Sequence, residues 1–134
     1  MMARTVLVTG GGRGIGLGVV LQFLDEGCNV TVLEKNLDAA DPSFADLVAS
    51  TPQLWAMAGD LNNPDDREAF LQGTIERFGR LDILVNNAGV APLVRRDLLE
   101  VVEQSWDFVL DTNLKANFFL TQRVAQLMMA QRPV

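Results

Sequence analysis

Apolar residues in this chain follow two alternating periodicities. Four short, mostly apolar runs have the length of buried strands: 6–8, 29–33, 54–58 and 81–85. Between them, apolar residues recur at helical spacing, as at Leu17, Val20, Leu21 and Leu24. Strands that alternate with helices form βαβ units with right-handed crossovers. The pattern therefore predicts an α/β protein, a Rossmann-like three-layer αβα fold around a parallel sheet.

Capping residues mark where the predicted helices begin and end. Asn63 is an N-cap residue followed by proline, and Gly79 ends the same helix. A short helix is expected over 43–49. After a loop at 91–103 with a short helical piece, a long helix is expected over 104–130, the last predicted element.

A glycine-rich turn follows the first predicted strand. Strand, glycine turn and helix together direct backbone N–H groups and the positive end of a helix dipole at a phosphate. Glycine permits close approach and φ > 0. We interpret the turn as the phosphate-binding part of a dinucleotide site, the alternative being a tight turn without a ligand. Its residues are Gly10, Gly11, Gly12, Arg13, Gly14, Ile15 and Gly16.

The glycine spacing separates three known motifs. A P-loop requires lysine after Gly16, where this chain has Leu17, and the common Gly-x-Gly-x-x-Gly fingerprint is absent from the sequence. The pattern Thr-Gly-x-x-x-Gly-x-Gly is present, with Thr9, Gly10, Gly14 and Gly16. This pattern resembles the short-chain dehydrogenase/reductase family.

An acidic residue ends the second predicted strand. Glu34 lies 18 positions after Gly16, near the spacing at which a carboxylate accepts hydrogen bonds from the adenosine ribose. A carboxylate there repels a 2′-phosphate, whereas Lys35 and Arg13 are able to pair with one. We expect NAD to be preferred over NADP. The alternative is a solvated Glu-Lys pair at a strand end.

The family resemblance implies roles for three further residues. Asp60 would hydrogen-bond the adenine amino group, and Leu61 would pack on the ring. Asn113 matches an asparagine that holds a water orienting the family's catalytic lysine. By themselves, Asp60 is also typical of a turn and Asn113 of an ordinary helix surface.

A second family signature follows the fourth predicted strand. The residues Asn86-Asn87-Ala88-Gly89 match it without change. The family's strand order, 3-2-1-4, places the first and fourth strands side by side at the topological switch point. The resemblance therefore implies that Asn87, Ala88 and Gly89 face the same crevice as the glycine turn.

Composition excludes several other functions. The net charge of −6 argues against nucleic-acid and membrane-surface partners. The sequence has no histidine, which excludes Ser-His-Asp catalysis and histidine metal ligands, and we expect no metal. A single cysteine, Cys28, fits a reducing compartment. With no apolar run of transmembrane length and no signal peptide apparent, we expect a cytoplasmic protein.

The resemblance covers residues 1–134 as the NAD(P)-binding, N-terminal part of a family domain. It implies that the complete enzyme transfers a hydride between nicotinamide and a secondary alcohol or ketone, and that helix 104–130 mediates homo-oligomerisation. The stretches around Asn87 and before Asn113 resemble 3-oxoacyl-carrier-protein reductases in particular. The family's catalytic serine and Tyr-x-x-x-Lys have no counterpart in this chain, which contains no tyrosine. We therefore expect a fold truncated after its fourth strand and long helix, and inactive alone.

Two other functions remain open at this point. The chain could be a non-catalytic dinucleotide-binding module or a decayed, truncated product of the family. It could also be an interaction protein that binds no nucleotide. The residues do not identify a substrate.

Overall fold

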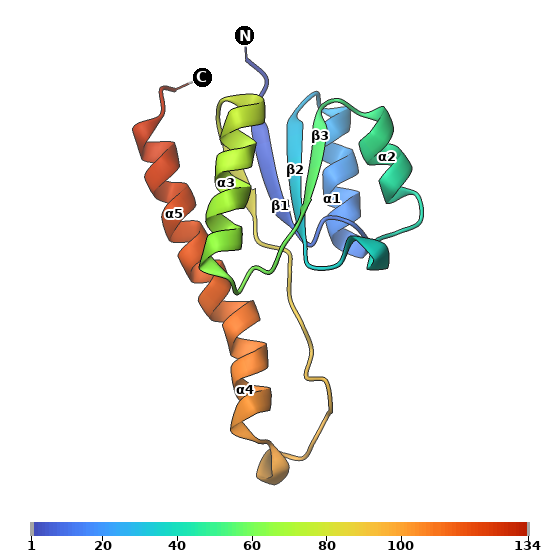
Figure 1. Ribbon diagram of the computed structural model, residues 1–134, viewed down its shortest axis with the longest axis vertical. Coiled ribbons are helices and arrows are strands. Elements are labelled where there is room, and N and C mark those ends of the chain that lie inside the picture. The colour runs from blue at the N-terminus through green and yellow to red at the C-terminus, as the bar shows by residue number, and fades with distance from the viewer. Residues whose placement is uncertain (1, 134) are drawn as a thin grey trace.

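A parallel sheet forms the centre of the computed structural model, which describes residues 2–133. Its strands lie in the order β3-β2-β1-β4, and every neighbouring pair is parallel. The strand bounds are β1 Thr5–Thr9, β2 Asn29–Glu34, β3 Leu54–Ala58 and β4 Ile83–Val85. The predicted parallel sheet and its strand order are confirmed (Figure 1).

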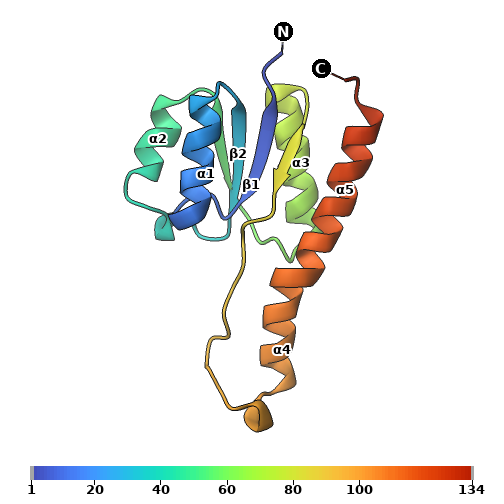
Figure 2. The same ribbon diagram turned by 180° about the vertical axis from the view of Figure 1, so that it is seen from behind.

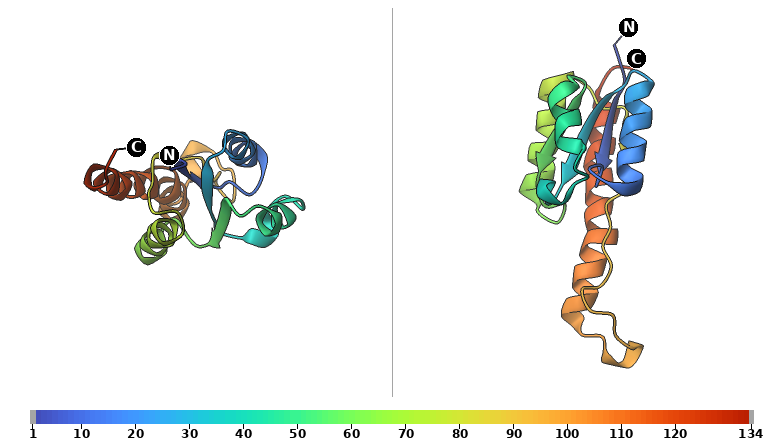
Figure 3. Two further views of the ribbon diagram at one scale, coloured as in Figure 1. Left: turned by 90° about the horizontal axis from the view of Figure 1, so that it is seen from above. Right: turned by 90° about the vertical axis from the view of Figure 1, so that its right-hand side faces the viewer.

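Helices cover both faces of the sheet. The α-helices are α1 Gly14–Asp25, α2 Phe44–Ser50, α3 Pro64–Phe78, α4 Glu103–Leu110 and α5 Asn117–Ala130. The shorter helical segments are η1 Leu37–Ala39, η2 Leu98–Glu100 and the π-helical η3 Asp111–Ala116. Helices α1 and α2 lie on one face and α3 and α5 on the other, which gives the three predicted layers (Figure 3).

Side-chain alternation along β1 divides the core in two. Val6 and Val8 pack with α1 and α2, whereas Leu7 points to the opposite face and packs with α3 and α5. All three are fully buried. Successive strand residues point to opposite faces, so a continuous apolar strand is what a sheet covered on both sides requires.

The predicted helix caps of α3 are present. The Asn63 side chain accepts hydrogen bonds from the backbone N–H groups of Asp65 and Asp66, and Gly79 ends the helix with φ +78°. The predicted short helix over 43–49 is observed as α2, displaced by one residue. These local signals were sufficient because capping depends on near neighbours in the sequence.

The continuous helix predicted over 104–130 is wrong in one respect. A π-helical turn, η3, separates α4 from α5. In a regular helix the Asn113 carbonyl would accept the backbone N–H four residues on. Here the side-chain amide of Asn117 donates to that carbonyl at 3.0 Å. Because π-helical turns are rare, the helical spacing of apolar residues predicted a continuous α-helix here.

The segment after β4 extends away from the sheet. The chain runs outward from β4, turns at η2 and returns through α4 to the body of the protein (Figure 2). Its tip exposes Leu98 and Leu99 almost completely. Within residues 2–133, none of the helices is both long enough and apolar enough to cross a membrane.

Candidate dinucleotide-binding cleft

The carboxyl ends of the strands open onto a cleft of about 570 Å³. Most of the residues expected at a cofactor site line it: Gly10, Arg13, Gly14, Ile15, Gly16, Glu34, Asp60, Leu61, Asn87, Ala88 and Gly89. Of the other three expected residues, Gly12 and Asn113 are hydrogen-bonded to this lining, whereas Gly11 faces the core beneath the turn. In open α/β sheets, this edge at the switch point between β1 and β4 is the usual ligand position.

Two kinds of constraint explain the glycines of the turn. Gly10 and Gly14 have φ of +68° and +54°, a backbone conformation in which a residue with a side chain is strained. Gly16 is required by packing, because a Cβ there would overlap the Gly10 carbonyl oxygen and lie 2.5 Å from the Asn87 amide nitrogen. At Gly11, a Cβ would lie 2.9 Å from the side chains that α1 and β2 place against the turn.

Hydrogen bonds join the glycine turn to the segment after β4. The Asn87 amide nitrogen donates to the carbonyls of Thr9 and Gly10 at 3.1 and 2.9 Å. In return, the Thr9 hydroxyl oxygen accepts from the backbone N–H groups of Asn87 and Ala88 at 3.1 and 3.0 Å. The juxtaposition expected of the two motifs is therefore present, and it is held by four hydrogen bonds.

Glu34 is fixed against the same turn. Its Oε1 accepts a hydrogen bond of 2.6 Å from the Gly12 backbone N–H. The next residue, Lys35, lies with its Nζ 3.8 Å from Oδ2 of Asp60, and both side chains are substantially exposed. A carboxylate thus stands at the end of β2 in a defined position, and the neighbouring lysine is directed toward the end of β3.

The loop after β3 is held by the first turns of α3. The Asp60 backbone N–H donates to Asp66 Oδ2 at 2.8 Å, and Arg67 donates to the Leu61 carbonyl at 2.8 Å. Leu61 lines the cleft but is only 6% exposed, so its side chain also belongs to the core.

Asn113 holds the loop that follows Gly89. Its Oδ1 accepts from the Val90 backbone N–H at 2.7 Å, and its Nδ2 donates to the Val90 carbonyl at 2.8 Å. These contacts explain the asparagine within the helical segment. The side-chain oxygen and nitrogen of Asn113 supply one acceptor and one donor, which pair with the backbone N–H and C=O of the same residue, Val90.

Sequence reasoning missed several cleft residues. Asn62, Val90, Phe108 and Thr112 line the cleft, and the Asn62 amide donates to the Thr112 hydroxyl at 2.8 Å. The position of Asn62 directly after the expected adenine pair was the available signal. The others come together only through the tertiary fold.

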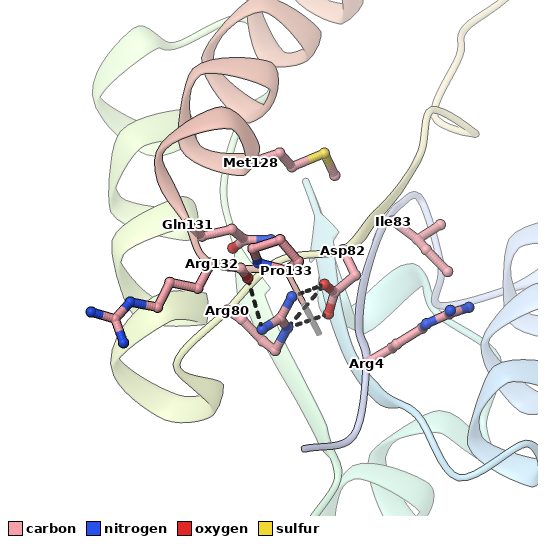
Figure 4. A pocket seen from close by; sticks show the side chains of 8 residues that line it. All are labelled: Arg4, Arg80, Asp82, Ile83, Met128, Gln131, Arg132 and Pro133. Atoms are coloured by element: carbon pink, nitrogen blue, oxygen red, sulfur yellow. Dashed lines mark hydrogen bonds and ion pairs between the residues drawn. The ribbon is translucent and has the colours of Figure 1, made fainter. Parts of the chain in front are cut away.

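A second cavity, of about 440 Å³, lies at the opposite end of the sheet (Figure 4). Arg80 pairs with Asp82 at 2.6 Å, and this hydrogen bonding holds the pKa of Asp82 below its usual value. The Arg80 guanidinium also donates to the Arg132 carbonyl. The side chains of Arg4 and Arg132 extend away from one another, so the cations do not converge on a common point (Figure 4).

The fold and the cleft at its switch point define a protein of the Rossmann type. The family model for short chain dehydrogenase matches residues 4–133. Over 134 residues, the chain is 37% identical to a 3-oxoacyl-[acyl-carrier-protein] reductase FabG of Staphylococcus aureus, covering 98% of this chain and 53% of the relative. It is 33% identical to dehydrogenase/reductase SDR family member 4 of Caenorhabditis elegans, covering 90% of this chain and 46% of that protein.

A solved structure shows the same family likeness. The 3-oxoacyl-[acyl-carrier protein] reductase from Brucella melitensis, crystallised in complex with NAD, superposes with a TM-score of 0.87 at 30% identity. All of this chain and 52% of that one are covered. The chain belongs to the short-chain dehydrogenase family. It spans about half the length of the curated relatives it matches.

Proposed function

We propose that this chain binds NAD in the cleft at the carboxyl ends of its strands. In the complete enzyme it would serve as the cofactor-binding part of an oxidoreductase that moves a hydride between nicotinamide and a secondary alcohol or ketone. The observation that carries the proposal is the hydrogen bonding of Asn87 to Thr9 and Gly10. It joins the phosphate-binding turn and the segment after β4 into the wall of one cleft.

The beginning of α1 suits the pyrophosphate. Gly14 is the first residue of α1, and the first turn of this helix contains no acidic residue. The unpaired N–H groups of a helix N-terminus and its dipole favour an anion at this position. Arg13, exposed beside the turn, adds a positive charge.

The ends of β2 and β3 suit an adenosine without a 2′-phosphate. Glu34 is anchored through Oε1 by Gly12, so its negative charge stays at the end of β2. Lys35 lies toward Asp60, which partly offsets its charge. We infer a preference for NAD over NADP, with Asp60 bonding the adenine amino group and Leu61 packing beside the ring.

Beyond the glycine turn, Asn87, Ala88 and Gly89 would approach the nicotinamide ribose. Asn113 would contribute to catalysis in the complete enzyme by ordering a water near a catalytic lysine. Its two hydrogen bonds to Val90 support a role in holding groups in place rather than in proton transfer.

The chain by itself is proposed to be inactive. Hydride transfer to a ketone needs a proton donor at the carbonyl oxygen. The sequence contains no tyrosine, so the residue that serves the family as proton donor has no counterpart in these 134 residues. Relatives about twice as long carry reductase names, so a carbonyl or alcohol substrate is proposed for the complete enzyme.

The long helical segment is proposed to mediate self-association. Trp106, Phe118 and Met129 are 61%, 60% and 86% exposed along α4 and α5. Large exposed apolar surface of this kind marks association sites. We also infer a reducing, cytoplasmic environment, which fits the single buried cysteine.

Titration with NADH, followed by nicotinamide fluorescence, tests the binding proposal. Gly16→Ala should weaken NADH binding by about tenfold, because the new methyl displaces the Gly10 carbonyl and the Asn87 amide. Gly18→Ala is the matched control. Gly18 lies on the same helix as Gly16, and a Cβ added there meets no atom within 4 Å. A chain that does not bind NADH would overturn the proposal and favour an interaction protein.

A further inference from the structure

The loop after β3 makes a side-chain hydrogen bond to the π-helical turn η3. Nδ2 of Asn62 donates to Oγ1 of Thr112 at 2.8 Å, across 50 positions of sequence. Both residues line the cleft. Thr112 is buried, whereas Asn62 is otherwise exposed. The bond therefore ties an exposed loop of the cleft to a buried point on a helix.

The turn that accepts this bond is also hydrogen-bonded to the loop after Gly89. Asn113 follows Thr112 directly, and its side chain makes two hydrogen bonds to the backbone of Val90. A continuous series of contacts thus runs from Asn62 through η3 to Val90. It joins the part of the cleft proposed for adenine to the part proposed for nicotinamide.

The local backbone makes this side-chain bond important. Residues 111–116 form a π-helical turn, which lacks the regular hydrogen-bond pattern of the helices on either side. The Arg123–Glu68 ion pair also connects α5 with α3, but its side chains are 38% and 44% exposed. This pair is bidentate, with two hydrogen bonds of 3.1 Å, but its two residues lie on α5 and α3 and outside the π-helical turn. Beside the two Asn113 bonds to Val90, the Asn62 bond to Thr112 gives the turn a second side-chain link to the cleft, on the side of the β3 loop.

We propose that Asn62 is a positioning residue of the cofactor site, acting through Thr112 and Asn113 on the loop at Val90. The part concerning cofactor binding rests on the proposed function. The part concerning the Val90 loop does not, because it is a property of the chain without ligand. An asparagine suits this role because it donates from a short side chain to a hydroxyl acceptor.

Amide exchange in the ligand-free chain tests the coupling. Asn62→Ala and Thr112→Val should each increase the exchange rate of the Val90 amide by about fivefold, which corresponds to ~1 kcal/mol for one hydrogen bond. The double variant should show no further increase, because both substitutions remove the same bond. Thr112→Ser keeps the hydroxyl and should retain the original rate. Exchange of α2 amides, on the other face of the sheet, should not change.

Binding measurements test the consequence for the cofactor. In Asn62→Ala and in Thr112→Val, NADH affinity should fall by about fivefold. The affinity for AMP, which has no nicotinamide, should change by less than about twofold. Glu68→Gln, which weakens the ion pair between α3 and α5 without touching the Asn62–Thr112 bond, should leave the Val90 exchange rate and NADH affinity unchanged.

Two results would overturn the inference. One is an unchanged Val90 exchange rate in Asn62→Ala and Thr112→Val. The other is a loss of AMP affinity in Asn62→Ala alone, which would make Asn62 a direct adenine contact. If the unsubstituted chain failed to bind NADH, the proposed function would fail, but the exchange result would still decide whether Asn62 positions the loop.

Discussion

Replacing Asn87 by alanine removes a side-chain amide that donates two hydrogen bonds across the junction of β1 and β4. The acceptors are the carbonyls of Thr9 and Gly10, at 3.1 and 2.9 Å. The backbone N–H of Asn87 keeps its own bond to the Thr9 hydroxyl, so the substitution leaves the rest of the junction intact. The change isolates the contribution of the amide group.

The expected cost follows from the two bonds. A hydrogen bond in a protein contributes about 1 kcal/mol net, and a partly buried carbonyl left without its donor adds to the loss. We therefore expect Asn87→Ala to lower the free energy of unfolding by about 2–3 kcal/mol. Neighbouring Asn86 is the matched control, because its amide donates one exposed hydrogen bond to Thr121 at 2.9 Å. Asn86→Ala should cost at most about 1 kcal/mol.

Urea unfolding followed by circular dichroism measures both values in the same chain. The midpoint should fall clearly for Asn87→Ala and only slightly for Asn86→Ala, with similar slopes. Equal shifts in the two variants would refute the reasoning. So would a value for Asn87→Ala within about 0.5 kcal/mol of the unsubstituted chain, the range of ordinary surface substitutions.

Three further predictions concern charge, pH and association. Glu34→Gln keeps an acceptor for the Gly12 N–H but removes the charge, so the ratio of NADPH to NADH affinity should rise; an unchanged ratio contradicts the assignment. Hydrogen bonds from Arg80 lower the pKa of Asp82, so its contribution to stability is present above the unfolded pKa of about 3.9 and is lost as pH falls through the lower folded pKa. Asp82→Asn should therefore flatten the acid limb of a stability–pH curve, and an unaltered limb contradicts this. Phe118→Lys should shift the chain toward monomer in analytical ultracentrifugation. An unchanged distribution of species would show that Phe118 plays no part in association.

Local signals in the sequence predicted much of the fold. Asn63 and Gly79 marked the ends of α3 because capping acts over a few residues. The fourth strand was predicted over 81–85 but begins at Ile83. The Gln131 side chain explains part of this difference: it bonds the backbone N–H and C=O of Leu81 from 50 residues away. Local propensity contains no information about such a partner.

In the candidate site, too, the local motifs could be predicted and the contacts between distant residues could not. The spacing of Gly10, Gly14 and Gly16 predicted the turn because the motif is local, and its juxtaposition with Asn87 followed from the family's strand order. The π-helical turn around Asn113 was not predicted, because such turns are rare and helical spacing of apolar residues is ordinarily interpreted as a continuous α-helix. Contacts between side chains distant in sequence require the tertiary structure.

Hydrogen bonds within the chain join the walls of the cleft. Asn87 fixes the turn to the segment after β4, Asn113 fixes the loop at Val90, and Gly12 fixes Glu34. The Glu34 bond occupies one carboxylate oxygen, and a carboxylate accepts further hydrogen bonds through its other lone pairs. Ribose hydroxyls could therefore bind without breaking that contact. A site organised in this way would lose little conformational entropy on binding, so the affinity proposed for NAD should depend on the placement of these polar groups more than on cleft size.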